Sequence, residues 1–284
     1  MKNTDSQFLK QLQFLNKVYD LVAKIIDEIE NIGKTKNYNS EIEDLYGSAR
    51  LVFLKRSLYR FNEIFKFLIL KLETESENLF IHYLPNLRCL FDIYSRLIFI
   101  IDNTIEKASL IIIAENLKKV ANIINSAQND TESLKKAYND QVNYYKTMFS
   151  SQGINLPQDP LLLSNNFLKT NNIQLPKIVL MLTPVRMRKF SNKTRKVWKT
   201  ISDNPYLIYR HFSSYAHGDD MNENHGNEIL WIASEMQMVG ILTLELFDSQ
   251  ILDDKFSTNI NLLLTEVNTL APEWVEYWQN RKLS

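Results

Sequence analysis

The chain has 284 residues, a formal net charge of zero and a single cysteine. Its 45% hydrophobic and 23% charged residues are typical of a folded globular protein and exclude a disordered one. Zero net charge excludes a global field that attracts nucleic acid, so any polyanion site must be a local patch. A lone cysteine excludes an intramolecular disulfide, and the apolar setting of Cys89 predicts a buried small hydrophobic residue.

Glycine is scarce, with six residues, whereas about twenty would follow from an average usage of roughly 7%. Because sheets use glycine in their turns, this scarcity predicts an all-α fold, a bundle of long antiparallel helices. The N-terminus lacks the hydrophobic region of a signal peptide. The best transmembrane candidate, Leu87–Ile101, carries charged residues and is too short to span a bilayer. We therefore expect a cytoplasmic protein with no membrane partner.

The first helix is predicted at residues 5–33, where apolar side chains recur at the spacing of one helix face. Gly33 is its predicted C-cap, and residues 34–40 have the composition of a linker. The prediction for domains is therefore an N-terminal helix with its linker at 1–39, followed by an all-α domain at 40–284.

Two local signals mark the next helices. Ser40-Glu41-Ile42-Glu43 is a capping box, which starts the second helix. Pro85 fits the first turn of the third helix. Together with the apolar periodicity, these signals predict helices at residues 40 to about 75, 85–102, about 104–127 and 131–150.

Residues 153–202 form a polar, proline-containing stretch that we interpret as a loop-rich, basic insertion. Short helical turns are predicted within it at 161–168 and 178–182, with a short basic helix at about 193–202. Long loops of this kind often carry function.

The remaining chain is predicted to form helices at residues 205–217, 228 to about 252, 256–270 and 272–281. Asn204 caps the first of them, Pro205 occupies its first position, and Gly218 ends it. The helix that starts at Glu228 is apolar over much of its surface, which predicts a central place in the core.

The helix at 205–217 holds the one concentrated group of polar, reactive side chains. At about 100° per residue, Arg210 and His217 lie about 20° apart around the axis and two turns apart along it. Ser213 and Ser214 lie between them on the same side. One stripe therefore carries a guanidinium, two hydroxyls and an imidazole.

This stripe suits phosphodiester chemistry. The guanidinium of Arg210 offers a fork of donors that matches a phosphate, and the imidazole of His217 titrates near neutral pH. Together they suit attack by a ribose 2′-hydroxyl on its neighbouring phosphate, without a metal. The reaction needs both an acid and a base, and a two-fold dimer would bring two stripes together. We therefore expect a homodimer with a composite site.

The spacing Arg210-x6-His217 resembles the Arg-x4–6-His motif of the HEPN superfamily, in which a polar residue, here His211, follows the arginine. The broader string Tyr209-x3-Ser213-x-Tyr-x-His is similar to a group of uncharacterised bacterial helical proteins.

Those proteins also tend to have an upstream helix with an Arg-x3-acidic spacing. Arg88-x3-Asp92 matches this element, with aspartate where glutamate is common. The resemblance covers about residues 85–250, and nothing before residue 85 contributes to it.

HEPN proteins are α-helical bundles that often dimerise, and many are metal-independent ribonucleases of toxin–antitoxin, abortive-infection and CRISPR-linked defence. The resemblance implies a HEPN-like core, RNA as substrate and an antitoxin or defence-system protein as a possible partner. It implies that Arg210 and His217 are the catalytic pair and that Asp92 orients Arg210. The supporting polar residues would be Tyr209, His211, Ser213 and Ser214.

A basic stretch lies directly before this helix, and seven of its fourteen residues are cationic with none acidic. The cations are Arg186, Arg188, Lys189, Lys193, Arg195, Lys196 and Lys199. Phe190 and Trp198 are interleaved with them, as in surfaces that hold single-stranded RNA by charge and stacking. The alternative is a solvated basic face with Trp198 anchored in the core.

Other interpretations of the stripe stay open. His217 could serve the dipole of its helix C-terminus, and Arg210 could pair with Asp203 or Asp92 in a non-catalytic binding or scaffold protein. The ligands of an alternative metal site would be His211, His217, Asp219, Asp220 and His225. That set lacks the i, i+4 spacing of helical metal motifs, so we expect no metal and no cofactor.

Overall fold

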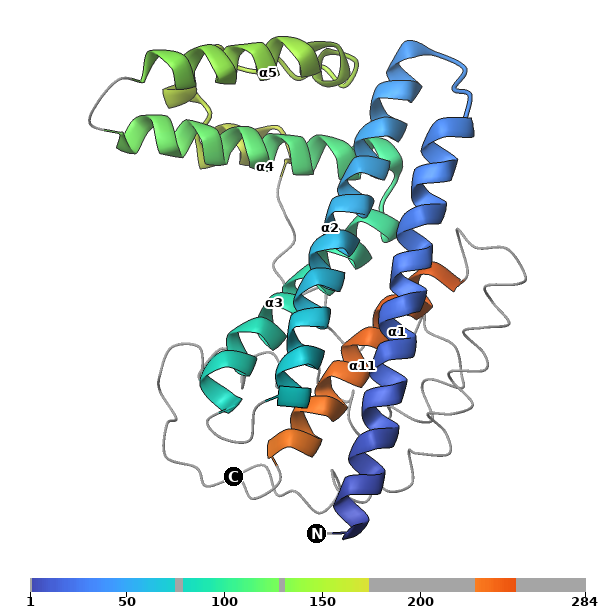
Figure 1. Ribbon diagram of the computed structural model, residues 1–284. Helices are drawn as coiled ribbons and strands as arrows, with labels where there is room; N and C mark the ends of the chain where they lie inside the picture. The colour runs from blue at the N-terminus through green and yellow to red at the C-terminus, as the bar shows by residue number, and fades with distance from the viewer. Residues whose placement is uncertain (1, 75–78, 128–130, 174–227, 249–284) are drawn as a thin grey trace. The chain divides into compact units, whose positions relative to one another are not determined.

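The computed structural model describes residues 2–74, 79–127, 131–173 and 228–248 (Figure 1). Every regular element in these ranges is a helix, which confirms the predicted all-α class. The elements are α1 (Lys2–Thr35), α2 (Glu41–Thr74), α3 (Leu79–Asp102), α4 (Ile105–Ser126), α5 (Glu132–Ser150), the 3-10 turn η1 (Pro160–Leu162), α6 (Asn165–Thr170) and α11 (Glu228–Asp248). The helical turn predicted at 178–182 and the helices predicted at 193–202, 205–217, 256–270 and 272–281 lie outside the described residues.

The helix starts follow from capping chemistry. The Ser40 hydroxyl accepts a hydrogen bond from the Glu43 N–H at 3.2 Å, as the capping box predicts. The Glu43 carboxylate in turn accepts from the Asn39 N–H at 3.1 Å. In the usual capping box it would accept from the N–H of the cap residue itself, here Ser40. Thr104 caps α4 by accepting from the Lys107 N–H at 3.3 Å.

Two predicted helix boundaries are wrong. Gly33 is not a C-cap but lies within α1, because the Lys36 N–H bonds to the Ile32 carbonyl at 3.0 Å and carries the helix past it. Pro85 lies inside α3, which begins at Leu79. The proline removes one backbone donor, but Tyr83 in the preceding turn is fully buried and its hydroxyl donates to the Leu68 carbonyl at 3.3 Å. Tertiary packing therefore extends the helix beyond the local signal.

The described residues form two compact units, one of residues 2–31, 54–74, 79–98 and 228–248, the other of residues 32–53, 99–127 and 131–173. The domain boundary predicted between residues 39 and 40 stays a prediction. None of the helices in the described ranges combines the length and apolarity that a membrane crossing requires.

In the first unit, α1 and α2 are antiparallel neighbours. Lys55 forms an ion pair with Glu30 at 2.7 Å, and the Lys66 ammonium lies 5.8 Å from the ring centre of Tyr19. From the first contact to the second, the position on α2 advances by eleven residues while the position on α1 goes back by eleven, so the two helices run in opposite directions. The predicted antiparallel bundle is consistent with this register.

α11 is the central helix of the first unit, as its sequence predicts. Its consecutive residues from Glu235 to Ile241 are all buried, so every side of the helix is covered. It lies against α1 and α2 (Figure 1), with Gly240 facing Val18 and Phe65.

Cys89 is a free thiol on α3 that is half-buried, so the prediction of a buried position is wrong. Leu87, Leu90 and Phe91 around it are fully buried, and they occupy the inward face of the helix at that point. Cys89 is left at the edge of this face.

In the second unit, α4 packs against α5 and η1, and Figure 1 shows α4 and α5 side by side. Tyr46, near the start of α2, is the main polar link. Its hydroxyl donates to the Met148 carbonyl at 2.7 Å, and its own carbonyl accepts from the Ser109 hydroxyl at 3.1 Å. One side chain thus joins the start of α2 to the end of α5, while its backbone is bonded to α4.

Candidate functional site

Asp92 is the one residue of the predicted Arg/His site that the structure describes. The other site residues, Tyr209, Arg210, His211, Ser213, Ser214 and His217, lie outside the described residues. So do the predicted RNA-binding residues Arg186, Arg188, Lys189, Lys193, Arg195, Lys196 and Lys199, and the alternative metal ligands Asp219, Asp220 and His225.

Asp92 and Arg88 lie one helical turn apart on α3 and are both half-buried. Residues four apart face the same side of a helix, so the guanidinium and the carboxylate share a partly accessible face. The flanking Phe91 and Ile93 are buried and hold that part of α3 in the core of its unit. Orientation of Arg210 by Asp92 stays a prediction.

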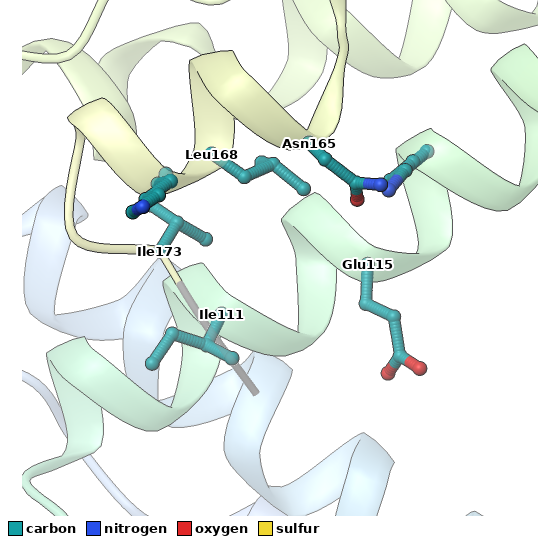
Figure 2. Close-up of a pocket in the computed structure, with 7 residues that line it drawn as sticks. Ile111, Glu115, Asn165, Leu168 and Ile173 are labelled. Carbon is teal, nitrogen blue, oxygen red and sulfur yellow. The ribbon is translucent and has the colours of Figure 1, made fainter. Parts of the chain in front are cut away.

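A groove that the sequence did not predict lies in the second unit, between α4 and the segment from α6 to Ile173 (Figure 2). Its volume is about 390 Å³. The lining residues are Ile111, Glu115, Lys118, Asn165, Leu168, Lys169 and Ile173. Among them Ile111, Leu168 and Ile173 are buried, with exposed fractions of 4%, 9% and 5%, and form an aliphatic floor.

The turn at the end of α6 positions two of these floor residues, Leu168 and Ile173. Asn172 has a left-handed backbone, with φ of 56°, and its N–H bonds to the Lys169 carbonyl at 3.1 Å. The Ile173 N–H bonds to the Leu168 carbonyl at 2.8 Å. This pair of bonds is a Schellman motif, which commonly brings together the side chains at the positions of Leu168 and Ile173.

The start of α6 positions Asn165 at the rim of the groove. The Ser164 hydroxyl accepts from the Phe167 N–H at 3.2 Å and caps the helix. Asn165 is therefore held as the first helical residue, and its exposed amide lies at the edge of the groove (Figure 2).

Upstream contacts anchor the whole segment. The Tyr138 hydroxyl of α5 donates to the Pro157 carbonyl at 2.9 Å. Burial, with a smaller contribution from nearby Asp159, raises the pKa of Tyr138 to about 12. The Asp159 carboxylate accepts from the Leu161 N–H at 3.0 Å and caps η1, whose first residue, Pro160, is buried.

The charges around the groove are unequal. Glu115 forms an ion pair with Lys119, one turn further along α4, at 3.2 Å. Lys118 and Lys169 have no ion-pair partner among the residues that the structure describes. Two cations and an amide therefore surround the aliphatic floor, and the one carboxylate already has a cationic partner.

The side chains that line the groove are aliphatic, amide or charged. Its lining includes no histidine, hydroxyl nucleophile or thiol. In the described ranges, no group of three histidine, cysteine, aspartate or glutamate residues is placed to hold a metal ion. A short helical turn predicted at 161–168 was a partial signal for this site, but no sequence pattern paired that turn with α4.

No protein-family model, no curated protein and no solved structure matches this chain.

Proposed function

We propose that the chain is a HEPN-like, metal-independent endoribonuclease that acts in the cytoplasm as a homodimer. The observation that carries the proposal is the placement of Arg210 and His217 two turns apart on one side of a predicted helix. Ser213 and Ser214 lie between them, so the stripe is polar along its whole length.

In the proposed reaction, a His217 imidazole takes the proton of a ribose 2′-hydroxyl, whose oxygen attacks the adjacent phosphorus. The bond to the 5′-oxygen breaks, and the leaving oxygen takes a proton from the imidazolium of the second subunit. Arg210 donates to the phosphoryl oxygens and stabilises the charge that develops on them. The products are a 2′,3′-cyclic phosphate and a 5′-hydroxyl.

Two further features support the proposal. All described elements are helices, as a HEPN-like core requires, and Arg88 and Asp92 share one face of α3. The basic stretch at 186–199 would hold the RNA backbone by charge, with Phe190 and Trp198 available for stacking.

The test is cleavage of total bacterial RNA by the purified chain in excess EDTA. The wild type should cut it, and Arg210→Ala and His217→Ala should each abolish cutting while the melting temperature stays nearly unchanged. His225→Ala is the matched control and should leave cutting intact, since His225 lies outside the Arg/His motif. Loss of activity in EDTA would show a metal enzyme instead.

The main alternative is a non-catalytic binding or scaffold protein with a degenerate HEPN fold. It is favoured if the wild type binds RNA without cutting it, or if Arg210→Ala and His217→Ala lower stability by several kcal/mol with no activity to lose. A toxin or defence effector should also arrest bacterial growth on expression. His217→Ala should relieve that arrest, and a protein that suppresses it would be the antitoxin-type partner.

A further inference from the structure

We propose that the groove between α4 and α6 binds a small amphipathic anion, a molecule with one anionic head group on a short aliphatic body. Neither the Arg/His stripe nor RNA cleavage enters this inference, which rests on the groove alone.

The dimensions of the groove fit such a molecule. Its volume of about 390 Å³ lies within the usual range of small-molecule sites, which is roughly 300–1,000 Å³. The floor of Ile111, Leu168 and Ile173 is aliphatic, and only a small part of each side chain is exposed. An apolar chain that lies on this floor removes mainly its own apolar surface from water, which favours binding.

The charge at the rim selects an anion. Lys118 and Lys169 contribute two ammonium groups, and Asn165 adds amide donors, whereas Glu115 is held by Lys119 at 3.2 Å. A cation would meet two like charges, and a neutral apolar ligand would partly dehydrate the ammonium groups without compensation. A carboxylate or similar head group pairs with them while its tail covers the floor.

The same lining disfavours RNA as the occupant. Bases in single-stranded RNA sites stack on aromatic rings or arginine planes. The groove has neither an aromatic residue nor an arginine among its lining residues. Its aliphatic floor therefore fits an alkyl chain better than a nucleobase.

The site is held in shape before any ligand arrives. The Ser164 cap fixes one end of α6, and the Schellman motif at Asn172 fixes the other. The Tyr138–Pro157 hydrogen bond anchors the chain upstream. Binding therefore requires little ordering of the backbone, which lowers its entropic cost.

Calorimetric titration of the full chain with decanoate tests the inference, with decanol as the uncharged comparison. Decanoate should bind the wild type more tightly than decanol does. Its affinity should fall as the salt concentration rises, because salt screens the ion pairs between its carboxylate and the two groove lysines. Lys118→Gln and Lys169→Gln should each weaken decanoate binding by about three- to fivefold. Lys135→Gln, an exposed lysine on α5 that does not line the groove, is the matched control and should change nothing.

A steric variant keeps the test independent of charge. Asn165→Trp places a large side chain at the rim from an exposed position. It should abolish decanoate binding while the circular dichroism spectrum and melting temperature stay those of the wild type. His217→Ala should bind decanoate as the wild type does, so failure of the ribonuclease proposal and failure of this one are separable.

The inference is overturned if decanoate does not bind, if decanol binds equally well, or if Lys135→Gln weakens binding as much as the groove variants do. Decanoate binding that survives Asn165→Trp in a folded protein would also overturn it, because the ligand would then occupy another site.

Discussion

Gly240→Ala is expected to destabilise the protein even though it replaces a glycine inside a helix. A Cβ at this position of α11 would lie 2.7 Å from Cγ1 of Val18 on α1 and 3.3 Å from Cζ of Phe65 on α2. Ordinary carbon contacts lie at about 3.5–4.0 Å, so the first distance is short by roughly 1 Å. Val18 and Phe65 are both 0% exposed, so neither can turn into solvent.

The size of the effect follows from two opposing terms. Overpacking of a filled core costs about 1–3 kcal/mol, and Val18 is a β-branched residue with a stiff rotamer in its helix. Replacement of glycine by alanine within a helix raises the free energy of unfolding by about 1 kcal/mol. The net loss in the free energy of unfolding should therefore be about 1 kcal/mol.

A double-mutant cycle with Val18→Ala isolates the close contact. Val18→Ala alone should cost about 2 kcal/mol, because it removes two buried methyl groups and leaves a small cavity. In that background Cγ1 is gone and the tightest remaining contact is Cζ of Phe65 at 3.3 Å, so Gly240→Ala should become neutral or stabilising by up to about 1 kcal/mol. The coupling energy between the two sites should be about 1–2 kcal/mol.

Urea unfolding followed by circular dichroism measures all four proteins, with Gly33→Ala as the matched control. Gly33 lies inside α1, and its nearest contact for an added Cβ is Cδ1 of Leu51 at an ordinary 3.7 Å. This control should stabilise the protein by roughly 0.5–1 kcal/mol. If Gly240→Ala has the same effect in both backgrounds, or stabilises the wild type as Gly33→Ala does, then α11 does not approach α1 closely at this point.

Three further predictions concern the second unit. Gly153→Ala should lower the free energy of unfolding by about 1–2 kcal/mol, because Gly153, in the turn just after α5, has a left-handed φ of 71°. Urea unfolding should show a loss of stability for Gly153→Ala and a gain for Gly33→Ala. Tyr46→Phe should cost about 1–2 kcal/mol, because the buried hydroxyl bonds to the Met148 carbonyl, whereas Tyr59→Phe on an exposed ring should cost nothing measurable. Tyr138→Phe should cost about 1 kcal/mol at neutral pH through loss of the bond to Pro157. Since burial raises the folded pKa of Tyr138 to about 12, the stability linked to its neutral hydroxyl is present below about pH 10 and is lost as pH rises toward 12. The gap between wild type and Tyr138→Phe should therefore narrow over that pH range, and a constant gap would contradict the assigned cause.

The helices of this protein were largely predictable because their signals are local. Apolar periodicity predicted α1, α2, α4 and α5 to within a few residues, and the Ser40 capping box starts α2 as expected. Both boundary errors involve a residue whose local preference was outweighed by packing or by continued helix hydrogen bonds, Gly33 inside α1 and Pro85 inside α3. Burial of Tyr83 is a tertiary effect, and local signals near Pro85 do not contain it.

The two candidate sites also differ in whether local sequence signals could predict them. The stripe with Arg210 and His217 could be predicted, because it depends only on a spacing of seven residues within one predicted helix. The α4–α6 groove could not be predicted, because Lys118 and Lys169 are distant in sequence and become neighbours only when the segment after α5 folds back. Gly153, with a left-handed backbone, lies just after α5 at the start of this return, and the left-handed Asn172 lies just after α6 and positions Ile173.

Asn172 shows why such a site escapes a pattern-based prediction. Glycine is the usual residue at the left-handed position of a Schellman motif, and asparagine serves there less often. An asparagine inside Asn171-Asn172 therefore gives a weak signal for the end of α6, yet the bonds at Lys169 and Leu168 depend on it. The consequence is that the groove floor depends on a residue that does not line the groove. Asn172→Gly should leave decanoate binding unchanged or slightly tighter, since it keeps the left-handed backbone at lower cost, whereas Asn172→Val should disturb Ile173 and weaken binding without removing any lining side chain.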